Sequence, residues 1–522
     1  MTTDLRGKIL WADDEIELLR AHVLYLRERG IEVSEVTNGQ DALAAVQKER
    51  FDLVLMDQMM PGLDGIATLR KIKDVRPTLP VVLITKNEEE WLMDEAISEK
   101  VSGYLTKPVN PSQIFLACKK ILEEEKILDD KATSGYLQDF QEIESALSSN
   151  LNINGWWQLY RKLLQWQLEM DERIDVGMKS ILEEQMTNCN KVFTQYIIDH
   201  YLQWIQATPT DRPRLATDVV RSVVAPELQE KHRVFLLVID CFRFDQALTI
   251  LPYIQQYFDV KVGYHVSLLP SATPFSRNGI FSGLTLEEIQ KKRPQLWSLM
   301  SRDEHSMNRE ELTLFREHLD RIGFKDRSLH YAKVSIAREG KSYLRKLGDI
   351  MGTDVIALVV NFVDLLTHHR SHSDLLQEML PDDTGYRSMV KTWFQNSWLL
   401  EVLRMLSDSN YKVILTSDHG SIRVQRAARV AGDRQTSSGV RYKYGRNLNC
   451  PEKHALVIKQ PAKYRLPELV RGTNYLIAKE DRYFVYPTEY HKYRTTLDGS
   501  FQHGGISLEE MLVPVLTLTS RR

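Results

Sequence analysis

Cysteine and long hydrophobic runs are both scarce in this 522-residue sequence. The four cysteines are too few and too scattered for a disulfide framework or a thiolate zinc site, so we expect free thiols in a reducing compartment. Apolar runs stay at strand length, well short of the roughly 20 residues that a membrane span needs, and no signal peptide precedes the first predicted strand. We therefore predict a cytoplasmic protein without membrane insertion.

An excess of one charge is also missing. There are 68 Lys and Arg residues and 71 Asp and Glu residues, and the resulting net charge of -3 says little about partners. With 43% hydrophobic and 27% charged residues, the composition is that of an ordinary soluble globular protein. The chain is too long for one hydrophobic core, so two or three domains are expected.

Three segments with different patterns follow one another along the chain. Residues 1–122 alternate short apolar runs, such as FDLVLM and PVVLIT, with amphipathic stretches, which is typical of a parallel sheet covered by helices. Residues 123–205 carry apolar residues at three- and four-residue spacing, which predicts a helical bundle or spacer. The prolines of TPTDRPRLATD break that pattern, and residues 206–522 return to strands such as RVFLLVID. We predict a multidomain α/β protein: a doubly wound parallel sheet, a helical spacer and a larger α/β domain.

Five polar residues of the first segment stand where predicted strands end. They are Asp13, Asp14, Asp57, Thr85 and Lys107. In an open parallel sheet the carboxyl ends of the strands share one edge, and ligands bind at that edge. Three carboxylates that converge there repel one another and need a divalent cation, and hard oxygen ligands suit magnesium. We therefore predict that the three aspartates bind Mg2+.

Asp57 is the predicted phosphoryl acceptor at this edge. Its carboxylate can attack a phosphoryl donor in line, while the Lys107 ammonium and the Thr85 hydroxyl bind the new phosphoryl oxygens. Taken singly, such residues could be a solvated lysine and a strand-end hydroxyl. Together with the runs DDE, MDQMMPGLDG and KP, they resemble the response-regulator receiver family over the whole segment. That resemblance implies a switch aromatic residue at Tyr104.

A second set of aspartate, histidine and threonine residues spans the last segment and again falls at predicted strand ends. Its members are Asp240, Thr273, Asp364, His368, Asp418, His419 and His503. On a helix, Asp364 and His368 would share one face and could bind the same ion. Aspartate and histidine ligands with open positions point to zinc, with manganese as the alternative. Taken alone, an Asp-His pair beside glycine is more often a turn, and Thr273 could cap a helix.

The order Asp, Thr, Asp-x3-His, Asp-His, His resembles the alkaline phosphatase superfamily. The closing run HGGISLEEMLVPVLTL is similar to the signature of its PglZ branch. The resemblance implies two zinc ions, one held by Asp364, His368 and His503 and the other by Asp240, Asp418, His419 and the Thr273 oxygen. The Thr273 hydroxyl is then the nucleophile of a phosphoester hydrolase that forms a phosphothreonine intermediate.

Basic residues follow the Asp-His pair. Between Ser421 and Arg446 there are seven of them against one acidic residue, with Tyr442 and Tyr444 among them. Arginine forks and aromatic rings beside a phosphoryl site suit a phosphodiester with bases attached, such as a linear or cyclic oligonucleotide. A solvated basic loop is an equally good interpretation. The candidate substrate contacts are Arg277, Asn278, Arg441 and Arg446.

The order of the three segments resembles that of a family of Bacteroidetes regulators associated with type IX secretion and gliding. The resemblance implies a sensor histidine kinase, a homodimer formed on phosphorylation, and contact with a secretion-machinery protein or a sigma factor. We predict a zinc-dependent phosphodiesterase regulated through Asp57.

Two other outputs are alternatives to hydrolysis. One is an adaptor that binds a nucleotide or a protein partner without turnover. The other is direct DNA binding, which is poorly supported because no helix-turn-helix pattern is found. Residues 285–350, rich in charge and of mixed pattern, are expected to form a cap over the site.

Overall fold

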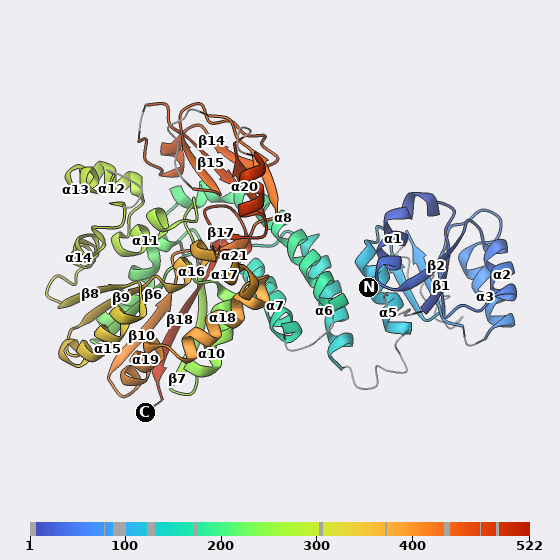
Figure 1. Ribbon diagram of the computed structural model, residues 1–522, viewed down its shortest axis with the longest axis horizontal. Coiled ribbons are helices and arrows are strands. Elements are labelled where there is room, and N and C mark those ends of the chain that lie inside the picture. Colours follow the sequence, from blue (N-terminus) through green and yellow to red (C-terminus); the bar gives the residue numbers. More distant parts are fainter. Residues whose placement is uncertain are drawn as a thin grey trace. The chain divides into compact units, whose positions relative to one another are not determined.

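The computed structural model describes residues 7–77, 79–86, 101–122, 131–171, 176–301, 306–370, 373–432, 439–469, 471–486 and 490–521. The chain forms two compact units (Figure 1). The first comprises Met1–Asn150 with Asp175–Ile181, and the second comprises Leu151–Ile174 with Leu182–Arg522. Within the described ranges, no helix is both long enough and apolar enough to cross a membrane.

A parallel five-stranded sheet forms the centre of the first unit, with the strand order β2-β1-β3-β4-β5. Its strands are β1 (Gly7–Ala12), β2 (Ile31–Val36), β3 (Leu53–Asp57), β4 (Val81–Thr85) and β5 (Gly103–Thr106). The pair α1 (Arg20–Glu28) and α5 (Pro111–Leu122) covers one face, and the pair α2 (Gly39–Lys48) and α3 (Gly65–Val75) covers the other (Figure 1). Because both faces are covered, β3 and β4 are buried along their whole length.

Three helices follow the first sheet: α6 (Lys131–Leu147), α7 (Ile153–Asp171) and α8 (Val176–Gln206). They confirm the helical spacer predicted from the apolar spacing. Within the second unit, the Trp157 ring of α7 lies 4.4 Å from that of Phe244 and 4.6 Å from that of Tyr264. At the end of α7, the Asp171 carboxylate accepts two hydrogen bonds from Arg387, of 2.7 and 2.8 Å. Helix α7 is therefore packed onto the second unit through both apolar and charged contacts.

The second unit is built on a six-stranded sheet with the order β7-β18-β10-β6-β9-β8. Its strands are β6 (Arg233–Ile239), β7 (Phe258–Val266), β8 (Leu329–Val334), β9 (Val355–Val360), β10 (Tyr411–Thr416) and β18 (Leu512–Ser520). Strand β18 runs antiparallel to both of its neighbours, whereas β10, β6, β9 and β8 are parallel. The carboxyl ends of these four parallel strands therefore meet at one edge of the sheet.

Helices cover both faces of this sheet, and smaller strands form separate sheets, of which β14 and β15 lie at the top of Figure 1. The helices are α9 (Ala225–Gln229), α10 (Phe244–Ile254), α11 (Thr273–Ser282), α12 (Leu286–Lys292), α13 (Pro294–Met300), α14 (Glu311–Arg321), α15 (Ala337–Ile350), α16 (Phe362–Arg370), α17 (Asp374–Met379), α18 (Asp383–Gln395), α19 (Trp398–Ser407), α20 (Tyr490–Leu497) and α21 (Leu508–Met511). The smaller strands are β11 (Ile422–Arg423), β12 (Arg426–Arg429), β13 (Tyr442–Gly445), β14 (Ala455–Ile458), β15 (Asn474–Ala478), β16 (Arg482–Val485) and β17 (Phe501–Gln502).

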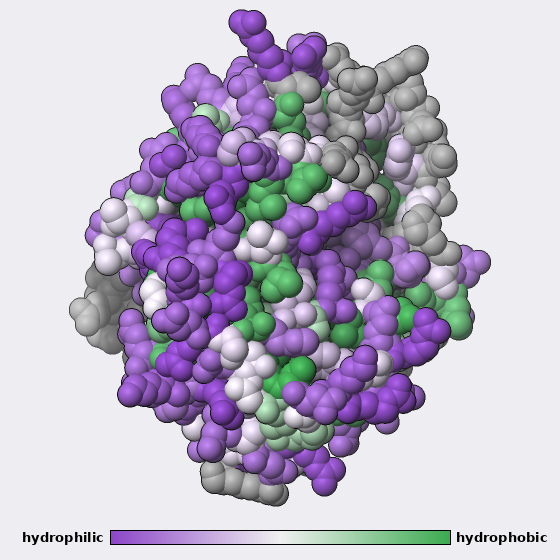
Figure 2. Space-filling model, turned by 90° about the vertical axis from the view of Figure 1, so that its left-hand side faces the viewer, coloured by the Kyte–Doolittle hydropathy of each residue, from purple (hydrophilic) through white to green (hydrophobic). Residues whose placement is uncertain are grey.

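Residues 285–350 are part of the main body of the second unit. Strand β8 pairs with β9 along its whole length and forms the edge of the sheet. Helix α14 packs against α11, and α15 packs against α19. Strand β8 and helix α15 therefore belong to the sheet and its covering layer, and the cap over the site stays a prediction for the rest of this segment. Figure 2 shows one side of the molecule, on which hydrophilic residues predominate and hydrophobic residues lie between them in small groups.

The packing of α7 can be tested through Trp157, which is only 5% exposed. Substitution Trp157→Ala removes a buried ring between Phe244 and Tyr264, so we expect the free energy of unfolding of the second unit to fall by about 3–5 kcal/mol. Urea denaturation followed by circular dichroism measures this change. The control Leu375→Ala, at a position that is 65% exposed, should change stability by less than about 0.5 kcal/mol. Equal effects of the two substitutions would contradict the described packing.

Candidate functional site

A cluster of carboxylates lies at the carboxyl edge of the first sheet. Asp13 and Asp14 follow β1 and Asp57 ends β3, and one oxygen from each of the three lies within 4.8 Å of the others. Lys107, which follows β5, places its Nζ 3.0 Å from Asp57 Oδ1 and 3.0 Å from Asp13 Oδ2. The structure thus brings together four of the five polar residues predicted for this edge.

The charge of this cluster is not balanced by Lys107. Burial raises the pKa of the Asp57 carboxyl above its ordinary value, Asp13 and Asp14 raise it further, and the hydrogen bond from Lys107 only partly offsets them. A divalent cation bound by oxygen ligands would remove this repulsion, and the three carboxylates fit magnesium. Thr85 is buried at the end of β4, beside β3, whereas Tyr104 on β5 is 48% exposed.

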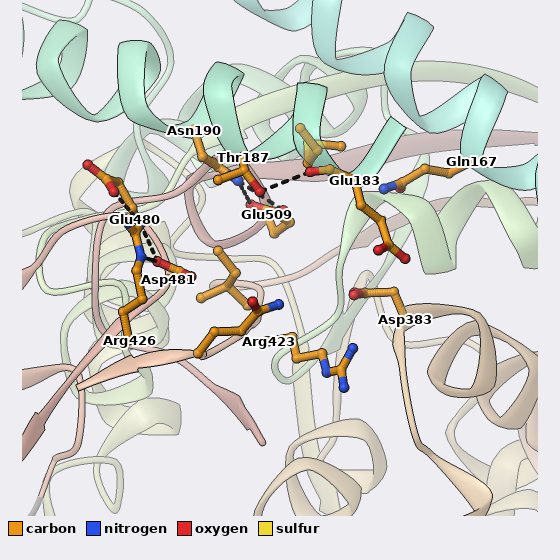
Figure 3. A pocket seen from close by; sticks show the side chains of 13 residues that line it. Gln167, Glu183, Thr187, Asn190, Asp383, Arg423, Arg426, Glu480, Asp481 and Glu509 are labelled. Carbon is orange, nitrogen blue, oxygen red and sulfur yellow. Dashed lines mark hydrogen bonds and ion pairs between the residues drawn. The ribbon is translucent and has the colours of Figure 1, made fainter. Parts of the chain in front are cut away.

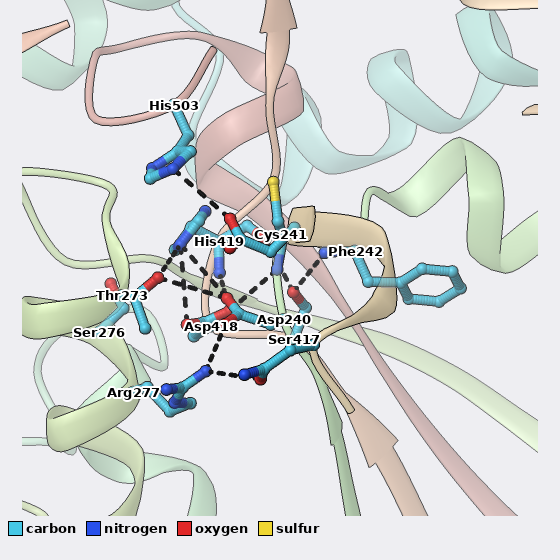
Figure 4. A network of polar contacts seen from close by, with 12 residues as sticks. Asp240, Cys241, Phe242, Thr273, Ser276, Arg277, Ser417, Asp418, His419 and His503 are labelled. Atoms are coloured by element: carbon cyan, nitrogen blue, oxygen red, sulfur yellow. Dashed lines mark hydrogen bonds and ion pairs between the residues drawn. The ribbon is translucent and has the colours of Figure 1, made fainter. Parts of the chain in front are cut away.

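A second cluster surrounds the Thr273 hydroxyl, at the carboxyl edge of the second sheet (Figure 4). Thr273 is the first residue of α11, and its Oγ1 lies 3.0 Å from His419 Nε2 and 3.3 Å from Asp240 Oδ1. The His419 Nδ1 lies 3.0 Å from the Gly420 carbonyl oxygen. Because Nδ1 then carries the proton, Nε2 keeps a lone pair that is directed toward Thr273 and Asp240.

A third cluster joins α16 to the loop after β17. Asp364 Oδ1 lies 3.3 Å from His368 Nε2 and 3.7 Å from His503 Nε2, and the two imidazole nitrogens are 3.2 Å apart. The His503 ring also stacks on the His419 ring, with 4.3 Å between their centroids. All seven residues predicted for the C-terminal site are therefore neighbours, although more than 260 positions separate Asp240 from His503.

The donor atoms of these two clusters fit metal ions. Asp418 Oδ2 and Asp364 Oδ1 are buried, and neither accepts a hydrogen bond within the described part of the chain. Burial and the neighbouring Asp240 raise the pKa of the Asp418 carboxyl to about 7, because two ionised carboxylates at this distance repel each other. Sets of two carboxylates with one imidazole, and of one carboxylate with two imidazoles, match zinc or manganese.

Arg277 holds one of these carboxylates in place. Its Nη1 donates to Asp240 Oδ2, and its Nε donates to Glu311 Oε1 at 2.6 Å. Burial raises the pKa of Asp240, but the charges of Arg277 and His419 lower it by more, so the net shift is downward. Figure 4 shows the guanidinium beside Asp240, on the side away from His503. Arg277 lines the cavity, but most of its hydrogen-bonding capacity is used by protein groups, and its contact with a substrate stays a prediction.

Three of the predicted substrate contacts do not lie at the cavity. The Asn278 amide is buried and donates to the carbonyls of Pro274 and Met307, at 2.8 and 3.0 Å. Arg441 is fully buried and donates to both carboxylate oxygens of Glu510, at 2.8 and 2.7 Å. Arg446 is exposed at the end of β13, outside the cavity lining. The predictions for Asn278 and Arg441 are wrong, because their polar atoms are committed to structural contacts, and the structure gives no support to Arg446.

The cavity at this site has a volume of about 460 Å³. Besides the predicted residues, its lining includes three polar side chains that the sequence did not single out: Asn308, Lys333 and Asn361. Burial and the nearby charge of Arg277 lower the pKa of Lys333. An apolar wall completes the lining, formed by Pro274, Val440, Tyr442 and Leu497. In the sequence, the one indication that Lys333 could line a site was its place near the end of a strand, because the surrounding segment 285–350 carries no motif.

Three family models match the chain. Residues 219–518 match the BREX system PglZ alkaline phosphatase-like domain, and residues 9–119 match the response regulator receiver domain. Residues 126–205 match the PorX response regulator linker domain. The three matched regions follow one another in the order of the three predicted segments.

Curated relatives match about a quarter of the chain. The transcriptional regulatory protein ResD of Bacillus subtilis is 34% identical over 115 residues, which are 22% of this chain and 48% of that protein. The transcriptional regulatory protein SrrA of Staphylococcus aureus is 26% identical over 140 residues, which are 27% of this chain and 58% of that protein. The chain thus spans about half the length of these relatives. Among solved structures, the chemotaxis protein CheY4 of Vibrio cholerae is 26% identical, with a TM-score of 0.21, over 22% of this chain and 98% of that one.

The charge balance at the first sheet can be tested through Lys107. Substitution Lys107→Met leaves Asp13 and Asp57 buried without a cation, so we expect the free energy of unfolding of the first unit to fall by about 3–5 kcal/mol. Added magnesium should restore much of this loss, because the ion replaces the missing charge. Thermal denaturation with and without magnesium measures both effects, and Lys86→Met, at an exposed lysine beside the same edge, is the control. A stable Lys107→Met variant that is indifferent to magnesium would contradict the predicted ion site.

Proposed function

Because the chain belongs to the PglZ alkaline phosphatase-like family and carries a receiver and a PorX-type linker, we propose that it is a two-component response regulator with a zinc-dependent phosphodiesterase as its output. The observation that carries the proposal is the place of the Thr273 hydroxyl. It lies 3.0 Å from His419 Nε2, in a cavity whose lining also contains Asp364, His368 and His503. A nucleophile between two sets of metal ligands is the arrangement that two-metal phosphoryl transfer requires.

The two ligand clusters would hold two zinc ions. Asp364, His368 and His503 would hold one ion, and Asp240, Asp418, His419 and the Thr273 oxygen would hold the other. When bound, the pair supplies positive charge for the attacking and the leaving oxygens of an in-line displacement.

The residues of the chain position and carry out the displacement. The Thr273 hydroxyl, which donates to Asp240 at 3.3 Å, passes its proton to that carboxylate as Oγ1 attacks phosphorus. The P–O bond to the leaving group breaks, and the leaving oxygen takes up a proton and departs as an alcohol. The remaining phosphoryl fragment stays esterified to Thr273 on α11 until water hydrolyses it. Arg277 keeps Asp240 in place through these steps, because its guanidinium is fixed on the other side by Glu311.

The cavity supports a linear or cyclic oligonucleotide as the substrate. Its volume of about 460 Å³ lies in the range of about 300–1,000 Å³ that pockets for organic ligands occupy, so it has room for more than inorganic phosphate. Lys333 and Asn308 can contact phosphate oxygens, and the wall with Tyr442 and Val440 can contact a base. The predicted substrate role of Arg441 is not part of this proposal.

Phosphorylation of Asp57 is proposed as the input. A receiver domain implies a cognate sensor histidine kinase, and the carboxylate of Asp57 lies beside Lys107 at the ion-binding edge. The half-exposed Tyr104 on β5 supports a change of surface that leads to a homodimer. A cytoplasmic location, a role in type IX secretion and gliding, and contact with a secretion-machinery protein or a sigma factor complete the proposal. The location rests on the four free cysteines, and the other roles rest on the resemblance of the three-segment order to regulators of type IX secretion.

Turnover is tested with zinc-loaded protein and a short oligonucleotide or a chromogenic diester. We expect Thr273→Ala to lower kcat by at least about a thousandfold, because the nucleophile is lost, and Thr273→Ser to keep measurable activity. The exposed Thr313, on α14, offers the matched control Thr313→Ala. Full activity of Thr273→Ala would refute the proposal. A wild-type protein that holds two zinc ions and binds the diester without cleaving it would instead favour the adaptor.

Dimerisation is tested by analytical ultracentrifugation with the phosphoryl mimic beryllofluoride and magnesium. We expect the wild-type protein to shift from monomer to dimer, because the mimic binds the Asp57 carboxylate and changes the face that carries Tyr104. The Asp57→Asn variant should stay monomeric under the same conditions. Identical mass with and without the mimic would count against this part of the proposal.

A further inference from the structure

Helix α8 makes direct hydrogen bonds to the segment that carries the candidate ligand His503. The Asn190 Nδ2 donates to both carboxylate oxygens of Glu509, at 3.1 and 3.0 Å, and the Leu508 amide donates to Asn190 Oδ1 at 2.8 Å. One turn further along α8, the Thr194 hydroxyl donates to the Ile506 carbonyl at 3.1 Å. Two side chains of the helix thus fix three successive parts of the segment from Ile506 to Glu509.

These contacts are buried and specific. Asn190 is 4% exposed, Glu509 is 7% exposed and Thr194 is 2% exposed. Within the described residues, Asn190 is the one side chain that donates a hydrogen bond to the Glu509 carboxylate. A buried carboxylate without a hydrogen-bond donor destabilises the fold by its full desolvation free energy. The position of Glu509 therefore depends strongly on that of α8.

The same segment supports both histidine ligands on its other side. A Cβ atom on Gly420 would lie 1.9 Å from the Glu509 carbonyl oxygen, and the Gly420 amide donates to the Glu510 carbonyl at 3.1 Å. Gly420 directly follows His419. The hydroxyl of Ser271, which lies two residues before Thr273, donates to the Gly505 carbonyl at 2.7 Å. A shift of the segment would therefore move His503, and would press on the backbone beside His419.

The junction has free space next to it. A cavity of about 90 Å³ is lined by Asn190 and Thr187 of α8, by Glu509 and by Arg423. Figure 3 shows Asn190 and Thr187 pointing from α8 toward Glu509, with the arginine across the opening. The Asn190–Glu509 contact thus has room to change, unlike a contact in a close-packed core.

We propose that Asn190 is a positioning residue through which α8 sets the zinc affinity of the candidate active site. Helix α8 is the last helix of the linker that separates the receiver from the hydrolase in sequence. A change in the position of α8 would therefore act directly on the contact between Asn190 and Glu509. Through Glu509 and the backbone from Ile506 to Leu508, the helix holds His503 and His419 where they can share ions with the aspartates. This inference rests on the proposed function, since it takes these residues as zinc ligands.

The test is a zinc titration of the full-length protein against a chromogenic chelator. Substitution Asn190→Asp places a carboxylate against Glu509 with no change in size, and we expect the zinc affinity to fall about tenfold, as for other residues that support metal ligands. The control Asn188→Asp makes the same chemical change at an exposed position of the same helix, two residues earlier, and should leave the affinity unchanged.

A double variant separates positioning from general damage. In Asn190→Asp combined with Glu509→Gln, the carboxylate and the amide exchange sides. The carboxylate on α8 can still accept from the Leu508 amide, and it now also accepts from the new glutamine. We expect this variant to recover the wild-type zinc affinity to within about twofold, which a merely structural loss would not do.

Unchanged zinc affinity in Asn190→Asp, or no recovery in the folded double variant, would overturn the positioning role of Asn190. If Asn190→Asp does not fold, Thr194→Val takes its place. That change removes one hydrogen bond to the Ile506 carbonyl, which keeps the Glu480 amide as a donor, and it should weaken zinc binding severalfold.

Because zinc is titrated without substrate, a protein that shows these shifts but cleaves no diester refutes the phosphodiesterase alone. Diester cleavage with wild-type zinc affinity in all variants refutes the positioning role alone.

Discussion

Carboxylates lie against one another at the carboxyl edge of both sheets, and their mutual repulsion is the constraint that shapes each site. In the first unit, Asp13 and Asp57 share one ammonium group, that of Lys107. In the second unit, Asp240 and Asp418 are fully desolvated, and the guanidinium of Arg277 reaches only the first of them. Bound cations would offset this repulsion, so we expect ions at the edges where these strands end.

The chemistry follows from what surrounds these charges. At the first sheet the donors are all carboxylate oxygens beside a lysine, which suits magnesium and transfer of a phosphoryl group onto an aspartate. At the second sheet imidazoles join the carboxylates, and a threonine hydroxyl lies 3.0 Å from one of them. That combination suits zinc and a covalent step on threonine. In the proposed function, both units therefore handle phosphoryl groups, with magnesium at the first sheet and zinc at the second.

Much of this could be predicted from the sequence, because the important residues follow strands and strands are marked by apolar runs. The order of the segments, the two sheets and the convergence of Asp240, Thr273, Asp364 and His503 all depend on that local signal. What could not be predicted depends on distant partners. Arg441 belongs to a basic run, but its role is decided by Glu510, 69 positions away. Lys333 lies in a segment that was expected to cap the site but in which no single residue stood out, and Asn190 looked like any polar residue of a helix.

The central claim is that Thr273 accepts a phosphoryl group from a diester in the zinc-loaded protein. Peptide mass spectrometry on an acid-quenched reaction tests it most directly. The account predicts a covalent adduct on the peptide that contains Thr273, with the mass of the transferred phosphoryl fragment. Continued formation of product with no adduct on that threonine, at any time during turnover, would contradict it.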